Sequence, residues 1–189
     1  MGQRSQIYVT WKNREGKNIL VARYFQWNFG ERMVSRAVSI ITELSRNLKY
    51  EYLWSEKSFP ERIGRFAEVN FDYRDICESH DIIKWFLETE DTDFNEYVFE
   101  CQDNNDGQLF IKVEDGKIKY GFLQNDFNSD NVMNAEQYMD WDYPSWKQDL
   151  EGTLYQATLD NIEFINKNAE LMTTEEIDLM RSANYLGGN

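Results

Sequence analysis

The fold is decided near the start of the chain, by residues 5–27, SQIYVTWKNREGKNILVARYFQW. Residues 5–12 predict a strand, and Asn-Arg-Glu-Gly at 13–16 predicts a turn. Residues 18–27 predict a second strand, because apolar side chains there alternate with more polar ones. The stretch therefore predicts a β-hairpin with a loop that is longer than the minimum.

A long helix is expected directly after this hairpin, over residues 31–49. Asn28-Phe29-Gly30 interrupts the strand pattern, and a single apolar stripe then recurs at helical spacing: Met33, Ala37, Ile40, Ile41, Leu44 and Leu48.

The rest of the chain predicts a second group of strands and then helices. Residues 94–123 are assigned to strands, including a hairpin around Asp115-Gly116, a strong turn signal. Residues 74–87 and 135–139 favour helices. Residues 145–184 are assigned to the C-terminal helices, the first running from 145 to 166 and the last beginning at the capping box of Thr173 and Glu176.

This order predicts one domain, residues 1–189, of the α+β class. We expect an N-terminal hairpin and an antiparallel sheet with helices packed on one face. We also expect that the hairpin, residues 5–27, could be deleted while the rest still folds.

Composition excludes several classes of protein. The 189 residues are 41% hydrophobic and 15% aromatic, which is ample core material despite a net charge of −14. The N-terminal residues lack a signal-peptide pattern, and no apolar run is long enough to span a membrane. With Cys77 and Cys101 as the two cysteines, we expect reduced thiols and a cytoplasmic location.

The charge is divided unevenly along the chain. Residues 1–65 carry a formal charge of +6, and residues 66–189 carry −20. Such a division predicts interaction surfaces rather than a requirement of the fold.

No familiar catalytic motif is present. A single histidine, His80, excludes a paired-histidine ribonuclease mechanism, and there is no nucleophile elbow, P-loop or Cys-x-x-Cys pair. The spacing from Asp103 does not fit an EF-hand, because Gly107 falls at position five. We therefore expect no cofactor. A divalent metal stays possible because acidic residues are numerous, although no motif supports one: Asp72, Asp75, Glu78, Asp81, Glu88, Asp91 and Asp93.

A block of basic, amide and aromatic residues around the hairpin is the strongest candidate site. Basic groups suit phosphates, and aromatic faces stack on bases. We predict contact with RNA or a partner through Arg4, Gln6, Tyr8, Lys12, Arg14, Arg23, Tyr24, Gln26, Trp27 and Arg32. The alternative is that the aromatic residues are core and the basic residues are solvated strand edges.

Four stretches of the chain resemble a family of small proteins from prophages and mobile elements of Gram-positive bacteria. They are MGQRSQIYV at 1–9, ARYFQWNFGERMVSRA at 22–37, NNDGQLFIKVEDGKIKYGFL at 104–123 and AEQYMDWDY at 135–143. In length, acidic character and N-terminal hairpin, the chain is also similar to a streptococcal-type anti-CRISPR protein that acts on the type II effector nuclease.

The second resemblance implies that the partners are the type II effector nuclease and its guide RNA. It implies inhibition in which the guide RNA is shortened, with residues 5–27 essential, and it leaves open whether this chain or its partner cuts. Two alternatives remain: a non-enzymatic acidic protein of a mobile element that binds a host protein, and a stand-alone nucleic-acid enzyme.

Overall fold

The strand nearest the N-terminus lies in the middle of the sheet. In the computed structural model, β1 (Arg4–Lys12) is flanked by β2 (Asn18–Gln26) and by β4 (Gln108–Glu114). The structure describes residues 3–28, 30–48, 59–67, 77–89, 93–100, 105–124, 131–148, 150 and 152–185. Every residue of β1 from Ser5 to Trp11 is buried, which requires cover on both faces of the sheet.

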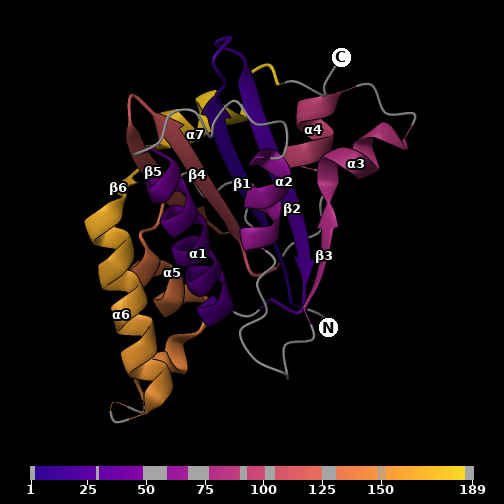
Figure 1. The fold of residues 1–189 in the computed structure, drawn as a ribbon. Coiled ribbons are helices and arrows are strands. Elements are labelled where there is room, and N and C mark those ends of the chain that lie inside the picture. Colours follow the sequence, from indigo (N-terminus) through magenta and orange to yellow (C-terminus); the bar gives the residue numbers. More distant parts are fainter. Residues whose placement is uncertain are drawn as a thin grey trace.

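The described residues form a six-stranded mixed sheet in the order β3-β2-β1-β4-β5-β6 (Figure 1). The remaining strands are β3 (Glu78–Asp81), β5 (Lys117–Leu123) and β6 (Glu170–Leu171). The helices are α1 (Gly30–Leu48), α2 (Phe59–Ala67), α3 (Ile82–Leu87), α4 (Phe94–Phe99), α5 (Ala135–Asp142), the 3₁₀ turn η2 (Pro144–Lys147), α6 (Thr153–Asn168) and α7 (Thr174–Arg181).

The α+β class and the N-terminal hairpin are confirmed, but the expectation of a purely antiparallel sheet is wrong. β1 runs parallel to β4, in a register from Gln6 opposite Gln108 to Thr10 opposite Lys112. β5 and β6 are also parallel, whereas the other neighbouring strands are antiparallel. The cause is that the connection between β2 and β4 contains helices and returns the chain to the starting end of β1.

Helices cover both faces, which corrects the expectation of helices on one face. One layer contains α1, α2, α5 and α6, and its core includes Val9, Ile40 and Ile165. The other contains α3, α4 and α7, whose core includes Tyr8 and Ile177. In Figure 1, α1 and α2 lie in front of the sheet and α7 lies behind it. Successive residues of a strand face opposite sides, so Tyr8 and Val9 belong to different cores.

Several local predictions hold in the structure. The apolar stripe of α1 is buried from Met33 to Leu44. The β4–β5 hairpin turns at Asp115 and Gly116, with φ of 50° and 75°, as a type I′ turn requires. The capping box at Thr173 is formed, because its side chain accepts from the N–H of Glu176 while the carboxylate of Glu176 accepts from the N–H of Thr173.

Three local predictions are wrong. Residues 94–99 form α4 rather than a strand, because Asp93 caps the helix by accepting from the N–H of Glu96 at 3.0 Å. Residues 78–81 form β3, within the range expected to be helical. The helix expected at 145–166 is divided into η2 and α6, since Gly152 is the N-cap of a new helix.

A buried polar chain joins β1 to the layer of α1 and α2. The Asn28 amide donates to Ser5 Oγ at 2.8 Å, and Arg36 Nε donates to Asn28 Oδ1 at 2.8 Å. Arg36 Nη1 also donates to the carbonyl oxygen of Ala67 at 2.6 Å, and its guanidinium lies 4.6 Å from the centre of the Phe25 ring. A buried arginine is tolerated only with such partners, so this chain fixes the end of β1 against α1.

Two further expectations can be compared with the structure. Within the described residues, no helix has the length and apolar character needed to cross a bilayer. The Cys77 thiol donates to the carbonyl oxygen of Glu78 at 3.9 Å, while Cys101 lies outside the described residues.

The hairpin is not a separable appendage. Deletion of residues 5–27 would remove β1 and β2 from the middle of the sheet and expose both cores. The expectation that the rest would still fold is therefore wrong, and function has to be tested with single substitutions.

We predict that Asn28→Ala lowers the free energy of unfolding by about 1–3 kcal/mol, because Ser5 and Arg36 both lose a buried partner. Urea denaturation checks this. The control is Asn161→Ala on α6, whose half-buried amide donates to Ser35 Oγ at 3.2 Å and can be replaced by water. Equal losses for the two variants would contradict a structural role for the buried chain.

Candidate nucleic-acid interface

Strand alternation places three of the predicted residues side by side. Even-numbered residues of β1 and β2 face the layer of α3, α4 and α7, as the burial of Tyr8 in that core shows. Arg4 lies opposite Gln26 in the β1–β2 register, and Tyr24 is the next residue of β2 on the same face. All three side chains are partly exposed.

The short strand β3 and helix α3 add two aromatic side chains to this group. His80 lies opposite Tyr24 in the β2–β3 register. β3 ends at Asp81, whose carboxylate accepts from the N–H of Lys84 at 3.1 Å and caps α3. The first turn of α3 then brings Trp85 onto both rings. We name Arg4, Tyr24, Gln26, His80 and Trp85 the Tyr24 surface.

The three rings are in mutual contact at the edge of the sheet. The centres of the His80 and Trp85 rings are 4.7 Å apart, with an angle of 27° between their planes. Trp85 lies 5.6 Å from Tyr24 at 48°, and Tyr24 lies 6.3 Å from His80. Because all three residues are only partly buried, each offers ring surface on which a planar group could stack.

Arg4 is fixed at this surface through its backbone. Its N–H donates to Asn105 Oδ1 at 2.8 Å, and its carbonyl oxygen accepts from the N–H groups of Asn105 and Asp106 at 3.0 and 2.9 Å. The partial burial of Tyr24 raises the pKa of its hydroxyl, and the positive charge of Arg4 opposes that rise. A positive charge therefore lies near Tyr24, and a cation beside an aromatic ring suits a phosphate and its base.

Gln6 and Tyr8 lie on the same face but inside the protein, with 0% exposure. The Tyr8 hydroxyl donates to the carbonyl oxygen of Val98 at 2.8 Å, and burial raises its pKa well above the usual range. Gln108 Nε2 donates to Gln6 Oε1 at 3.4 Å, and Arg181 donates to Gln108 Oε1 at 2.8 Å. Neither Gln6 nor Tyr8 is part of a surface, because α4 and α7 cover them.

The predicted basic residues of the hairpin are dispersed. Lys12 is exposed at the far end of β1, about 26 Å from Arg4 at the usual rise per residue of a strand, and Arg14 is exposed in the loop. Arg23 faces the other layer, where its guanidinium packs against Gly64 and Nη2 lies 3.9 Å from the Asp81 carboxylate. The structure does not bring these three to the Tyr24 surface.

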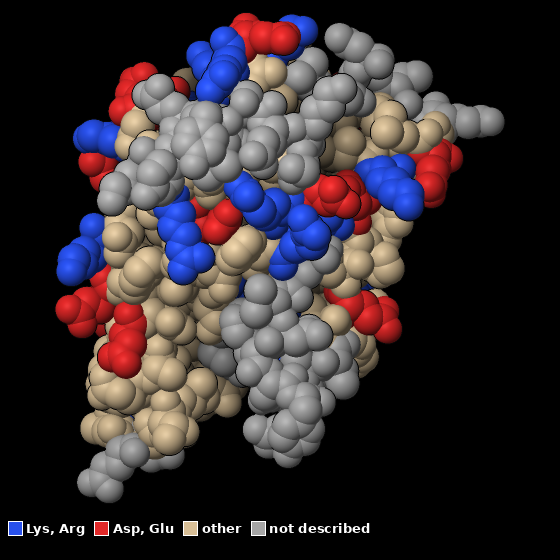
Figure 2. Space-filling model, in the orientation of Figure 1, with Lys and Arg blue, Asp and Glu red and all other residues tan. Residues whose placement is uncertain are grey.

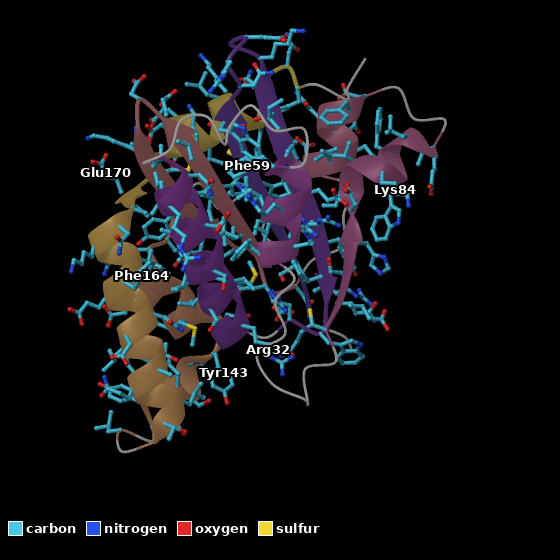
Figure 3. All side chains as sticks on the ribbon, viewed as in Figure 1. Arg32, Phe59, Lys84, Tyr143, Phe164 and Glu170 are labelled. Atoms are coloured by element: carbon cyan, nitrogen blue, oxygen red, sulfur yellow. The ribbon has the colours of Figure 1, made fainter. Side chains whose placement is uncertain are left out.

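Trp27 and Arg32 form a separate pair at the end of β2. Trp27 has a φ of 65°, which ends the strand, and Arg32 Nη1 donates to its carbonyl oxygen at 3.4 Å. Figure 3 shows Arg32 at the lower end of α1, in the layer that covers the opposite face. The pair borders the Tyr24 surface and does not extend its row of rings.

The charge division along the sequence is not reproduced as one basic patch on the face shown in Figure 2, where blue and red groups are interspersed over α1 and α2. Part of the reason is local pairing within the first third of the chain. Arg62 Nε lies 3.0 Å from the Glu43 carboxylate, and Arg46 Nη1 lies 3.9 Å from it.

The candidate carboxylates for a metal do not converge in the part of the chain that the structure describes. There, no group of three or more His, Cys, Asp or Glu side chains is placed to hold an ion. Asp72, Asp75 and Asp91 lie outside the described residues. A divalent metal therefore stays an untested alternative to the expectation of no cofactor.

His80 and Trp85 are the residues that sequence reasoning missed. The sequence predicts a helix across both, which hides the strand that pairs His80 with Tyr24. The one available signal is Asp81, a capping residue followed by the apolar run Ile82, Ile83, Trp85 and Phe86. A helix capped by Asp81 begins after His80, so this signal would have left His80 outside the helix.

We predict that Asp106→Asn stabilises the protein at neutral pH. Asp106, whose N–H holds Arg4, is buried, and burial raises the pKa of its carboxyl despite a hydrogen bond with Asp142. The pKa of this carboxyl is higher in the folded state than the value of about 3.9 in the unfolded state. The free energy of unfolding therefore falls as pH rises from the unfolded-state pKa to the folded-state pKa. The variant should therefore gain stability at pH 7 and lose that gain as pH is lowered toward about 4.

The measurement is the free energy of unfolding in urea across that pH range. A difference between the two proteins that stays constant with pH would show that ionisation of Asp106 is not the cause.

We compared the chain with family models, with curated proteins and with solved structures. None of the three comparisons gives a match.

Proposed function

We propose that this chain is an anti-CRISPR protein that acts on the type II RNA-guided nuclease in the host cytoplasm and contacts the guide RNA through the Tyr24 surface. The observation that supports RNA contact is the group of three half-exposed rings beside Arg4. The prophage and anti-CRISPR resemblance supports the choice of effector.

Unpaired RNA suits this surface better than a duplex does. Single strands are recognised by stacking of their exposed bases on aromatic side chains, with cations along the backbone. Before it pairs with its target, the guide offers such bases, and the effector holds it in a positively charged channel. The acidic character of residues 66–189, with a formal charge of −20, favours approach to that channel.

In this proposal each member of the surface has a role. Trp85 and Tyr24 stack on bases, Arg4 contacts a phosphate, and Gln26 offers an amide to a base edge. His80 keeps Trp85 in position through their stacked contact at 4.7 Å. Whether the guide is cut by this chain or by its partner is a separate question, which reconstitution answers.

We predict that Trp85→Ala weakens binding of a labelled single-stranded RNA by about 5- to 150-fold, because one stacked base contributes about 1–3 kcal/mol. Fluorescence anisotropy measures the affinity. The matched control is Tyr155→Ala, which also removes a partly buried aromatic ring. That ring is stacked on Trp146 in the opposite layer. Equal effects of the two substitutions would reject the Tyr24 surface as the binding site.

We predict that Arg4→Gln makes the slope of log binding constant against log salt concentration less steep by about 0.7. This is the contribution of one phosphate contact on a single strand. The control is Arg46→Gln on α1, whose side chain is 68% exposed in the other layer and should leave the slope unchanged. An unchanged slope for Arg4→Gln would remove this residue from the proposed contact.

Reconstitution of the chain with the effector and labelled guide RNA separates the remaining functions. A shortened guide that depends on the effector supports the proposal. An intact guide in a stable complex indicates an inhibitor that only docks, and RNA loss without the effector indicates a stand-alone enzyme. No interaction with effector or guide would place the function outside CRISPR.

A further inference from the structure

The outer edge of β2 is paired over only part of its length. β3 accompanies β2 from Gln26 to Arg23, where Arg23 lies opposite Asp81. At the other end, Asn18 forms a bridge with Tyr185. Between these points, residues 19–22 have no neighbouring strand on that side in the part of the chain that the structure describes.

The direction of the free backbone groups follows from the hairpin. Asn13 donates to the carbonyl oxygen of Lys17, and Trp27 donates to that of Gln3, so odd-numbered residues of β2 bond to β1. In an antiparallel pair the intervening residues direct their N–H and C=O groups the other way. Leu20 therefore presents a donor and an acceptor along the open edge, and Ala22 presents its N–H donor at the spacing of a strand.

These groups lie at the floor of a groove of about 460 Å³. One wall comes from Pro60 and Glu61 of α2, and the other comes from Ile83, Lys84 and Leu87 of α3. Figure 1 shows the two helices on either side of β2, and Figure 3 shows Lys84 on α3. Leu87 is 66% exposed, a large apolar group at the open rim.

The two walls carry opposite charges. Glu61 and Lys84 are exposed, and among the described residues neither has an ion-pair partner. The side chains of an extended peptide alternate between the two walls. A basic residue would meet Glu61, and an acidic residue of the opposite parity would meet Lys84.

We propose that this groove, the β2 groove, binds an extended peptide segment of a partner protein, which adds to the edge of β2 in line with β3. Backbone hydrogen bonds to Leu20 and Ala22 give the affinity, and the walls select apolar residues with one basic and one acidic residue on opposite faces. The walls disfavour edge-to-edge pairing with a second copy, since that copy would bring its own α2 and α3 to the same place. This site is distinct from the Tyr24 surface and does not depend on RNA binding.

The probes are two labelled hexapeptides of the same composition, Val-Val-Lys-Val-Val-Glu and Val-Val-Glu-Val-Val-Lys, with polar ends for solubility. In both, Lys and Glu lie on opposite faces of the extended chain. For a strand bound in one direction, the two probes differ in which of the two charges comes first along the groove. A third probe carries N-methyl groups on its central residues and removes backbone donors while keeping the side chains. Binding is measured by fluorescence anisotropy, and amide protection at Leu20 and Ala22 is measured by NMR hydrogen exchange.

We expect saturable binding of at least one hexapeptide, protection of the Leu20 and Ala22 amides, and loss of both with the N-methylated probe. Single substitutions Glu61→Gln and Lys84→Gln should each weaken binding by about two- to fivefold, the effect of one exposed ion pair. The double variant Glu61→Lys with Lys84→Glu should reverse the preference between the two hexapeptides. These residues are exposed, so the fold is retained.

The matched control is Glu163→Lys with Lys167→Glu on α6, an exposed charge exchange in another part of the molecule that should change nothing. The proposal is overturned by equal affinities of both hexapeptides for wild type and double variant, or by protection of other amides instead. It is also overturned if wild type sediments as a dimer with Leu20 and Ala22 already protected, since a second copy then fills the groove.

Discussion

The structure depends on the parallel pairing of β1 with β4. This pairing joins the N-terminal hairpin to the β4–β5 hairpin and makes one sheet of the two. Because β1 carries apolar side chains on both faces, Tyr8 on one and Val9 on the other, both faces need cover, and the two helical layers provide it. The resulting arrangement explains why the hairpin resembles an independent unit in sequence and yet is the centre of the protein.

A strand that is buried on both faces has little hydrophobic alternation to set its register, so polar groups have to contribute. Ser5 reaches Asn28 and Arg36 in one layer, while the next residue, Gln6, reaches Gln108 in the other. A shift by one residue would place each of these groups in the wrong layer without its partner. The buried polar pairs therefore specify which side of β1 faces which helices.

The proposed sites follow from the limited length of β3. Its four residues pair with β2 from Arg23 to Gln26 and bring His80 to Tyr24. Asp81 then ends the strand by capping α3. Residues 19–22 of β2 are left with an open edge between α2 and α3. One capping residue thus determines both the aromatic surface and the β2 groove, and it places them along the same edge of the sheet.

The sequence alone determined the elements whose signals are local: the hairpin of residues 5–27, the helix with its stripe from Met33 to Leu44, the Asp115-Gly116 turn and the capping box at Thr173. It also included Arg4, Tyr24 and Gln26 in a larger candidate site, because basic, amide and aromatic residues gather around the hairpin. Only the tertiary structure decided that β1 pairs with β4 in parallel, that Gln6 and Tyr8 are interior, and that His80 and Trp85 join Tyr24. Those contacts connect residues far apart in the chain, and no periodicity within a short window records which distant strand or helix will cover a given face.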